Sequence, residues 1–318
     1  MRAVLRREYG GAEVIELAEI ETPEPAQGEV RVRVTAAGID AGAIHFLEGE
    51  PRLVRLALGR PAPKDPRIGT ELAGVVEAVG EGVTTLSVGD AVFGVSQGAW
   101  ADALVASAAK LARMPQGLDP ADAAAAAVSG ITALDALRAA GPLAGKRVLV
   151  TGAGGGVGTF LVQFAVADGA VVTGVCSTAK VALVMQLGAT AVVDYTQGEP
   201  TGEFDVIFDT GGSRPHAQLR DLTVRGGRVV LIGGEGGSGP LGGYEKQLLA
   251  PLTMLFSGRR FVSVTSSTTT AKLEALGTRL LAGDARAAIE RRYPLEQTAE
   301  AVARFLSGKV AGKLVIEP

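Results

Sequence analysis

The sequence predicts an α/β protein of two domains, one of which is a doubly wound parallel sheet. The chain has 318 residues, more than one hydrophobic core usually holds, and 47% of them are hydrophobic, which is enough to fill two cores. Up to about residue 110, short β-branched runs are separated by glycine, proline and acidic turns. From about 145 to 265, such runs alternate with helix-length segments, a pattern typical of parallel strands with helices on both faces.

The first part of the chain is expected to be mainly β-structure. Its strand candidates are VRVRVTAAGI (30–39), LAGVVEAVG (72–80) and DAVFGV (90–95). The alanine-rich stretch ADAAAAAV (121–128) favours a packed helix, because alanine has the highest helix propensity.

The second part supplies the strands of the parallel sheet and then a shorter α/β tail. The six strand candidates are RVLVT (147–151), VVTGV (171–175), AVVDY (191–195), DVIFD (205–209), RVVLIG (228–233) and FVSVT (261–265). After residue 270 the pattern predicts a helix, a strand near 287–292, a helix over 295–308 and a last strand in GKLVIEP (312–318).

Composition favours a small-molecule partner. The net charge is −3 and no segment concentrates positive charge, which argues against nucleic-acid or membrane-surface binding. The chain begins without the apolar core of a signal peptide and holds no apolar run long enough to span a bilayer, so we expect a soluble cytoplasmic protein. A single cysteine, Cys176, excludes an internal disulfide, and two histidines, His45 and His216, leave little for a metal cage.

The segment VLVTGAGGGVG (148–158) is a strand that enters a glycine turn and then a helix, the context that a dinucleotide site requires. Its spacing is Ala153-x-Gly155-x-x-Gly158, with alanine at the first glycine position. Bare backbone lets a pyrophosphate approach the N–H groups at the helix start, where the helix dipole favours negative charge. A tight strand-to-helix connection without a ligand is the alternative, but the β/α pattern that follows favours the cofactor.

The end of the next strand indicates which dinucleotide binds. An NADH site usually has an acid about 20 residues after the turn, which binds the ribose hydroxyls. This strand instead ends in Cys176 and Ser177, followed by Thr178 and Lys180. Hydroxyls and a lysine, with no carboxylate, favour the 2′-phosphate of NADPH. Alternatively, Ser177 and Thr178 cap the following helix and Lys180 is a solvated residue.

Taken together, VSGITALDAL (128–137), the glycine turn and GVCSTAKVALVMQLGATAVVDYT (174–196) resemble the medium-chain dehydrogenase/reductases, and within them the zinc-independent quinone oxidoreductases. The resemblance covers essentially the whole chain. It implies a GroES-like catalytic domain of residues 1–124, to which 266–318 return, and a Rossmann NADP-binding domain of residues 125–265, with the cofactor in the cleft between them. It also implies a homodimer formed through the edge strand RRFVSVT (259–265).

The resemblance also assigns cofactor positions. Thr132 matches a residue beside the nicotinamide, and Ser177, Lys180 and Tyr195 match the surroundings of the 2′-phosphate. Gly211 in DTGG (209–212) and Gly233 in LIGG (231–234) match strand ends beneath the ribose and nicotinamide. The pyrophosphate turn comprises Ala153, Gly155, Gly156, Val157 and Gly158. Strand-end glycines can also be plain turns, and Tyr195 an ordinary surface residue.

Departures from the zinc-dependent relatives predict the chemistry. Those relatives have a cysteine and a histidine where this chain has Asp40 and Thr70, and the cysteine-rich lobe for a structural metal is missing here. Asp40 and Glu71 alone make a poor zinc site, so we expect no metal. Without a Lewis acid, reduction of a quinone or an enone is favoured, because the developing charge spreads over the product.

Asp40 and His45, in GIDAGAIHF (38–46), are the candidate proton donors. The alternatives are that Asp40 caps a helix and that His45 is structural. Ala43, Ile44 and Ala103 suggest a roomy apolar pocket with Trp100 as one wall, although Trp100 can equally be a core residue. Two other functions stay open: a redox-neutral cyclase or conjugate-addition enzyme that uses Asp40 and His45, and a non-catalytic NADPH-binding protein.

Overall fold

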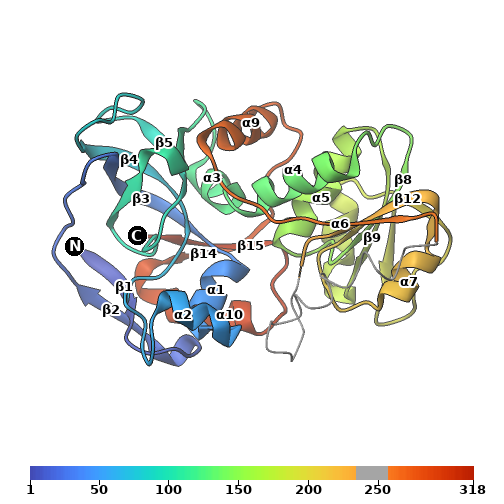
Figure 1. Cartoon of the computed structure of the whole chain (residues 1–318), viewed down its shortest axis with the longest axis horizontal. Helices are drawn as coiled ribbons and strands as arrows, with labels where there is room; N and C mark the ends of the chain where they lie inside the picture. Colours follow the sequence, from blue (N-terminus) through green and yellow to red (C-terminus); the bar gives the residue numbers. More distant parts are fainter. Residues whose placement is uncertain (234–256) are drawn as a thin grey trace. The chain divides into compact units, whose positions relative to one another are not determined.

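The computed structural model describes residues 1–233 and 257–318, and the chain folds into two compact units (Figure 1). Unit 1 is formed by Met1–Ile131 together with Ser267–Pro318, and unit 2 by Thr132–Ser266. The helix α4 (Ser129–Ala140) carries the chain from the first unit into the second.

Unit 1 is built on a mainly antiparallel sheet. The sheet has seven strands in the order β14-β15-β3-β4-β5-β7, with β6 paired to β3, and only β14 and β15 are parallel to each other. The strands are β3 (Glu29–Ile39), β4 (Glu71–Val79), β5 (Ala91–Val95), β6 (Ala103–Ser107), β7 (Leu111–Arg113), β14 (Ile289–Pro294) and β15 (Lys313–Glu317). A separate antiparallel pair is formed by β1 (Arg2–Arg6) and β2 (Ile15–Glu19).

Short helices complete unit 1. They are α1 (Ala41–Glu48), α2 (Arg55–Leu58), α3 (Pro120–Ala126), α9 (Thr270–Leu281) and α10 (Thr298–Leu306). The sequence pattern predicted mainly β-segments up to about residue 110, so the helix α2 is a correction, and α1 corresponds to the alternative that Asp40 caps a helix. Asp40 begins α1 by accepting a hydrogen bond from the backbone of Ala43, and Gly49 ends it in the left-handed conformation.

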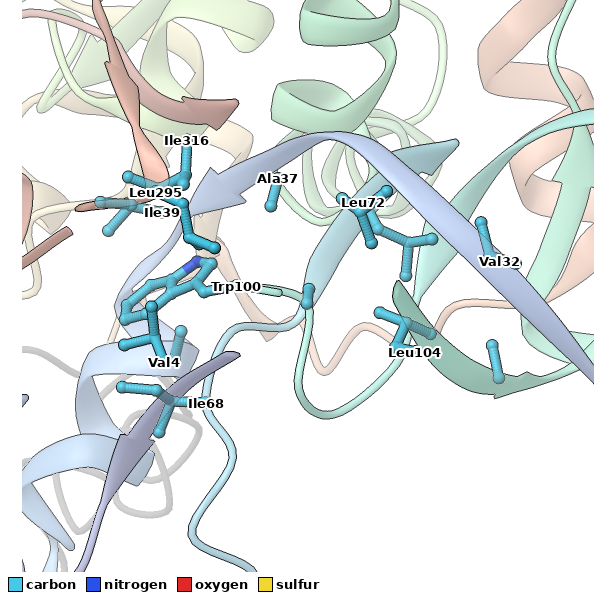
Figure 2. Close-up of a cluster of buried hydrophobic side chains, with 14 of the residues drawn as sticks. Val4, Val32, Ala37, Ile39, Ile68, Leu72, Trp100, Leu104, Leu295 and Ile316 are labelled. Carbon is cyan, nitrogen blue, oxygen red and sulfur yellow. The ribbon is translucent and has the colours of Figure 1, made fainter. Parts of the chain in front are cut away.

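The core of unit 1 gathers around Trp100 (Figure 2). The indole is 0% exposed, and its Nε1 donates to the carbonyl of Gly38 at 3.1 Å. Trp100 is therefore a core residue and not an open pocket wall. Ala43, Ile44 and Ala103 are buried as well.

Unit 2 is a parallel six-stranded sheet in the order β10-β9-β8-β11-β12-β13, which confirms the predicted fold class. Its strands are β8 (Arg147–Thr151), β9 (Val171–Cys176), β10 (Ala191–Asp194), β11 (Phe204–Asp209), β12 (Thr223–Leu231) and β13 (Arg260–Ser263). Its helices after α4 are α5 (Gly156–Ala167), α6 (Val181–Gln186) and α7 (His216–Asp221).

The strand order of unit 2 reverses next to β8, because the chain continues to β9 on one side and returns to β11 on the other. Right-handed crossovers then put α5 and α6 on one face of the sheet and α7 on the other. A parallel sheet covered on both faces has buried strands, and Val148, Leu149 and Val150 in β8 are fully buried. Ligands of such sheets bind at the carboxyl ends of the strands, where the order reverses.

The described residues hold no single helix that is long and apolar enough to cross a membrane. The bent pair α3 and α4 passes a test of length and composition alone, and five alanines of α3 are buried.

Candidate functional site

The glycine turn lies at the carboxyl end of β8, where the strand order of unit 2 reverses. Gly152 has a positive φ of 68°, and a Cβ there would overlap the hydroxyl of Thr210. A Cβ on Gly158 would overlap the carbonyl of Gly152, so both positions require glycine. Gly155 caps α5 without a side-chain hydrogen bond, which leaves the first N–H groups of the helix without a side-chain cap.

The five predicted turn residues divide into two groups. Gly155, Gly156 and Val157 are partly exposed at the start of α5, while Ala153 and Gly158 are buried. The backbone N–H of Ala153 donates to the carbonyl of Val175 at 3.0 Å. Ala153 thus joins the turn to β9, and its methyl group packs inside, which accounts for alanine at this position.

A buried carboxyl group supports the turn from β11. The Thr151 hydroxyl donates to Asp209 at 2.5 Å, and the Thr210 hydroxyl donates to the Thr151 carbonyl at 2.8 Å. Burial raises the pKa of Asp209. Gly211 follows β11 and Gly233 follows β12, so these two predicted residues lie at the carboxyl ends of adjacent strands. Gly234, the last residue of LIGG, lies outside the described residues.

Ser177, Lys180 and Tyr195 lie at the carboxyl ends of β9 and β10. Ser177 precedes a 3₁₀ turn (Thr178–Lys180) and makes no side-chain capping bond. The Lys180 side chain lies against the glycine turn, since a Cβ on Gly154 would be 2.8 Å from its Cβ and Cδ. Tyr195 is 54% exposed, and its backbone N–H donates to the carbonyl of Cys176 at 3.1 Å.

Sequence reasoning missed Asp194 at this edge of the sheet. It is the last residue of β10 and lies in register with Cys176 of β9. Its carboxylate accepts hydrogen bonds from the Thr178 hydroxyl at 2.6 Å and from the Thr196 hydroxyl at 2.8 Å. A carboxylate that the sequence analysis did not consider therefore lies at this edge of the sheet. The aspartate is visible in AVVDYT (191–196). It was not considered because the acid that binds the ribose of NADH is expected at the end of the second strand of the sheet, and Asp194 ends the third.

Unit 1 holds a second polar cluster, which begins at Asp40. Asp40 is 7% exposed and caps α1, where its Oδ1 accepts from the Ala43 N–H at 3.1 Å. Its Oδ2 accepts from the Thr70 hydroxyl. The capping alternative for Asp40 is thus what the structure shows, and both carboxylate oxygens are engaged.

Glu71 and Lys313 form a buried ion pair next to Asp40. Lys313 Nζ lies 2.5 Å from Glu71 Oε2, and the side chains of Lys313 and Glu71 are 2% and 0% exposed. The backbone N–H of Val128 donates to the other Glu71 oxygen at 2.9 Å, and Lys313 also donates to the Ser129 hydroxyl at 3.3 Å. Burial raises the pKa of Glu71 to about 7, against the lowering effect of Lys313, and Asp40 adds to the rise.

His45 lies in the middle of α1, and no hydrogen bond between described residues joins it to Asp40. Its Nδ1 is buried and has no hydrogen-bond partner in the described part of the chain. Thr132 is on α4, three residues after Ser129, and is half-buried. The predicted positions therefore divide between a cofactor group in unit 2 and a polar group in unit 1.

The polar cluster of unit 1 does not suit zinc. The Thr70 hydroxyl donates a hydrogen bond to Asp40, and Lys313 Nζ already occupies Glu71 Oε2. Zinc needs three or four donors free of such partners. Across the described ranges, no group of three or more His, Cys, Asp and Glu side chains could hold a metal ion.

A parallel sheet with a glycine turn where its strand order reverses, together with a β-rich unit made from both ends of the chain, defines a two-domain dehydrogenase or reductase. Two family profiles match: "Alcohol dehydrogenase GroES-like domain" at residues 26–116 and "Zinc-binding dehydrogenase" at residues 187–316.

Similar proteins of known activity indicate which branch of these enzymes the chain resembles. The quinone oxidoreductase of Pseudomonas aeruginosa is 31% identical over 328 residues, covering 98% of this chain and 97% of that protein. The 2-methylene-furan-3-one reductase of Solanum lycopersicum is 30% identical over 337 residues, covering 100% of this chain and 79% of that protein. The solved quinone oxidoreductase of Coxiella burnetii shares the fold, with a TM-score of 0.87 at 23% identity and coverage of 100% and 99%. The chain belongs to the medium-chain dehydrogenase/reductase family, in its quinone oxidoreductase-like branch.

Membership makes the chain an oxidoreductase with a small-molecule substrate and implies a nicotinamide cofactor. The glycine turn fits that group. Gly152 and Gly158 keep the backbone open, and partly exposed N–H groups begin α5.

Proposed function

We propose that this chain is an NADPH-dependent, zinc-independent reductase of quinones or of activated C=C bonds in small, hydrophobic enones. The observation that carries the proposal is the packing of Lys180 on Gly154, which ties a cationic side chain to the glycine turn. A lysine held beside a pyrophosphate-binding turn favours a cofactor with an additional phosphate.

The residues that would hold the cofactor follow from the geometry of unit 2. Backbone N–H groups of Gly155, Gly156 and Val157 would bind the pyrophosphate at the start of α5. The hydroxyl of Ser177 makes no capping bond and is available to a 2′-phosphate, with Lys180 and Tyr195 near the same strand ends. When bound, the nicotinamide supplies the hydride, and the protein supplies orientation and a dry site.

The substrate class follows from the polar cluster of unit 1. The Lys313 ammonium is the cation of this cluster. It contacts Glu71 and, unlike a metal ion, cannot act as a Lewis acid that polarises a carbonyl group. Reduction of a quinone or enone needs less charge stabilisation, because the negative charge spreads over the hydroquinone or enolate oxygen. The names of the relatives, quinone oxidoreductase and 2-methylene-furan-3-one reductase, support the same substrate class.

We assign the role of donating a proton to the reduced substrate to His45 and not to Asp40. Both oxygens of Asp40 already accept hydrogen bonds, whereas Nδ1 of His45 has no partner among the described residues. Asp40 then fixes the start of α1, which carries His45. A hydride and a proton together convert a quinone to a hydroquinone, or an enone to a saturated ketone.

The test is cofactor consumption followed by absorbance, with NADPH and NADH in parallel, against a panel of quinones and enones. We expect NADPH to be oxidised and NADH to be used at least tenfold less efficiently in kcat/KM. NADPH binding without oxidation of any panel member would favour the redox-neutral or the non-catalytic alternative. Equal use of both cofactors would refute the assignment of NADPH.

A further inference from the structure

Asp194 lies between the two loops that carry the proposed 2′-phosphate residues. It is the last residue of β10 and pairs with Cys176, the last residue of β9. Ser177 comes directly after Cys176. A carboxylate thus lies beside Tyr195 in the chain and pairs with the residue before Ser177, next to two of the positions proposed for a phosphate, and two negative charges that lie close together repel each other.

Both oxygens of Asp194 are occupied. Oδ2 accepts from the Thr178 hydroxyl at 2.6 Å. Oδ1 accepts from the N–H of Thr196 at 2.9 Å and from its hydroxyl at 2.8 Å. The two threonine hydroxyls are themselves 3.0 Å apart. The hydrogen bond from Thr178 is the main reason that the pKa of Asp194 is lowered, so the group is a carboxylate at neutral pH.

This arrangement disfavours each of the two cofactors for a different reason. A carboxylate with a free oxygen accepts hydrogen bonds from the ribose hydroxyls of NADH. Here the two threonines already take three of the roughly four acceptor positions of the carboxylate. The charge of the carboxylate is not removed by these bonds, and it still acts on a nearby phosphate over a distance of several ångströms.

We propose that Asp194 determines how strongly the protein discriminates between NADPH and NADH: its charge limits the affinity for NADPH, and Thr178 keeps the carboxylate from accepting the ribose hydroxyl of NADH. The inference rests on the proposed function, since it takes Ser177 and Lys180 as the 2′-phosphate site. It makes Asp194 a specificity residue that the proposed function does not include.

Two variants of the full chain give opposite predictions. Asp194→Asn keeps an oxygen for Thr178 and removes the charge, and it should tighten NADPH binding about three- to tenfold while NADH binding changes less than twofold. Thr178→Val frees Oδ2 and should lower the ratio of NADPH to NADH affinity about threefold. Glu203→Gln is the matched control: this exposed acid precedes β11, at the amino edge of the same sheet, and the ratio should not change.

Both dissociation constants are measured by titration of each protein with NADPH and with NADH, at low and at high salt. The gain in Asp194→Asn should shrink at high salt, because screening weakens a charge effect. Equal weakening of both cofactors in Asp194→Asn would overturn the inference and make the network a scaffold only. If the wild type prefers NADPH and Asp194→Asn leaves the ratio of NADPH to NADH affinity unchanged, the inference is also overturned. A wild type that binds NADPH and NADH equally well would instead refute the proposed function. Even then, a rise in the ratio of NADPH to NADH affinity in Asp194→Asn would support the role of Asp194.

Discussion

Replacement of Glu71 by glutamine should change how the stability of unit 1 depends on pH. Glu71 is fully buried, and its pKa is about 7 in the folded protein against 4.5 in the unfolded chain. Below about pH 4.5 both states hold the proton. Between about 4.5 and 7 the unfolded chain releases the proton and the folded protein keeps it, so the free energy of unfolding falls as pH rises.

The size of this effect follows from the same two values. Each unit of pKa difference corresponds to about 1.4 kcal/mol, so the whole interval costs about 3 kcal/mol of stability, which is lost by pH 7 and stays constant above it. Glutamine does not titrate. The stability of Glu71→Gln relative to the wild type should therefore rise by about 3 kcal/mol between pH 4.5 and 8, whatever constant penalty the amide brings.

The assay is urea unfolding at several pH values, followed by tryptophan fluorescence. Trp100 is the chain's single tryptophan and is fully buried in unit 1, so it reports the unfolding of that unit. Glu81→Gln is the control, because Glu81 is exposed in a turn. A constant difference between Glu71→Gln and the wild type across this pH range would refute the argument that burial keeps Glu71 protonated.

Four further predictions concern the cofactor, the proton, the metal and the assembly. Gly158→Ala should weaken NADPH binding at least tenfold in a titration, because the new Cβ overlaps the Gly152 carbonyl; unchanged affinity would contradict the close approach. His45→Ala should lower kcat with a quinone about a hundredfold without changing the NADPH dissociation constant, and a kcat equal to that of the wild type would exclude His45 as the donor. Dialysis against a chelator should leave turnover unchanged, since Lys313 already occupies the Glu71 carboxyl group; loss of activity that zinc restores would show the opposite. Light scattering should give twice the chain mass of 32.4 kDa, because β13 is the edge strand among the described strands of unit 2 and such an edge can pair with a second copy, and the mass of a single chain would argue against that interface.

Local sequence patterns were sufficient to predict the parallel sheet and the glycine turn. Strands buried on both faces are continuous β-branched runs, and a turn whose backbone is crowded must contain glycine. The same patterns missed α1, since a short helix that begins DAGAIH has neither the length nor the periodicity of a surface helix. Its start is fixed by Asp40, whose second hydrogen bond comes from Thr70 in a different part of the sequence.

The parts of the site that could not be predicted depend on distant pairings. Glu71 and Lys313 are 242 residues apart, and no local pattern indicates that they meet. Thr178, in the turn after β9, and Asp194, at the end of β10, are 16 residues apart, and their contact depends on the register between β9 and β10. Register follows from packing of the complete sheet, so a rule based on one strand end does not detect it.

The pairing of β3 with β15 also bears on how the chain is made. Unit 2 is one continuous stretch, whereas the central strand β3 of unit 1 has β15, which begins at Lys313, as a neighbour. On the ribosome, residues 132–266 have all emerged while Glu71 still lacks its cation. Unit 2 can therefore fold during translation as soon as it has emerged, whereas the sheet of unit 1 stays incomplete until β15 has emerged as well.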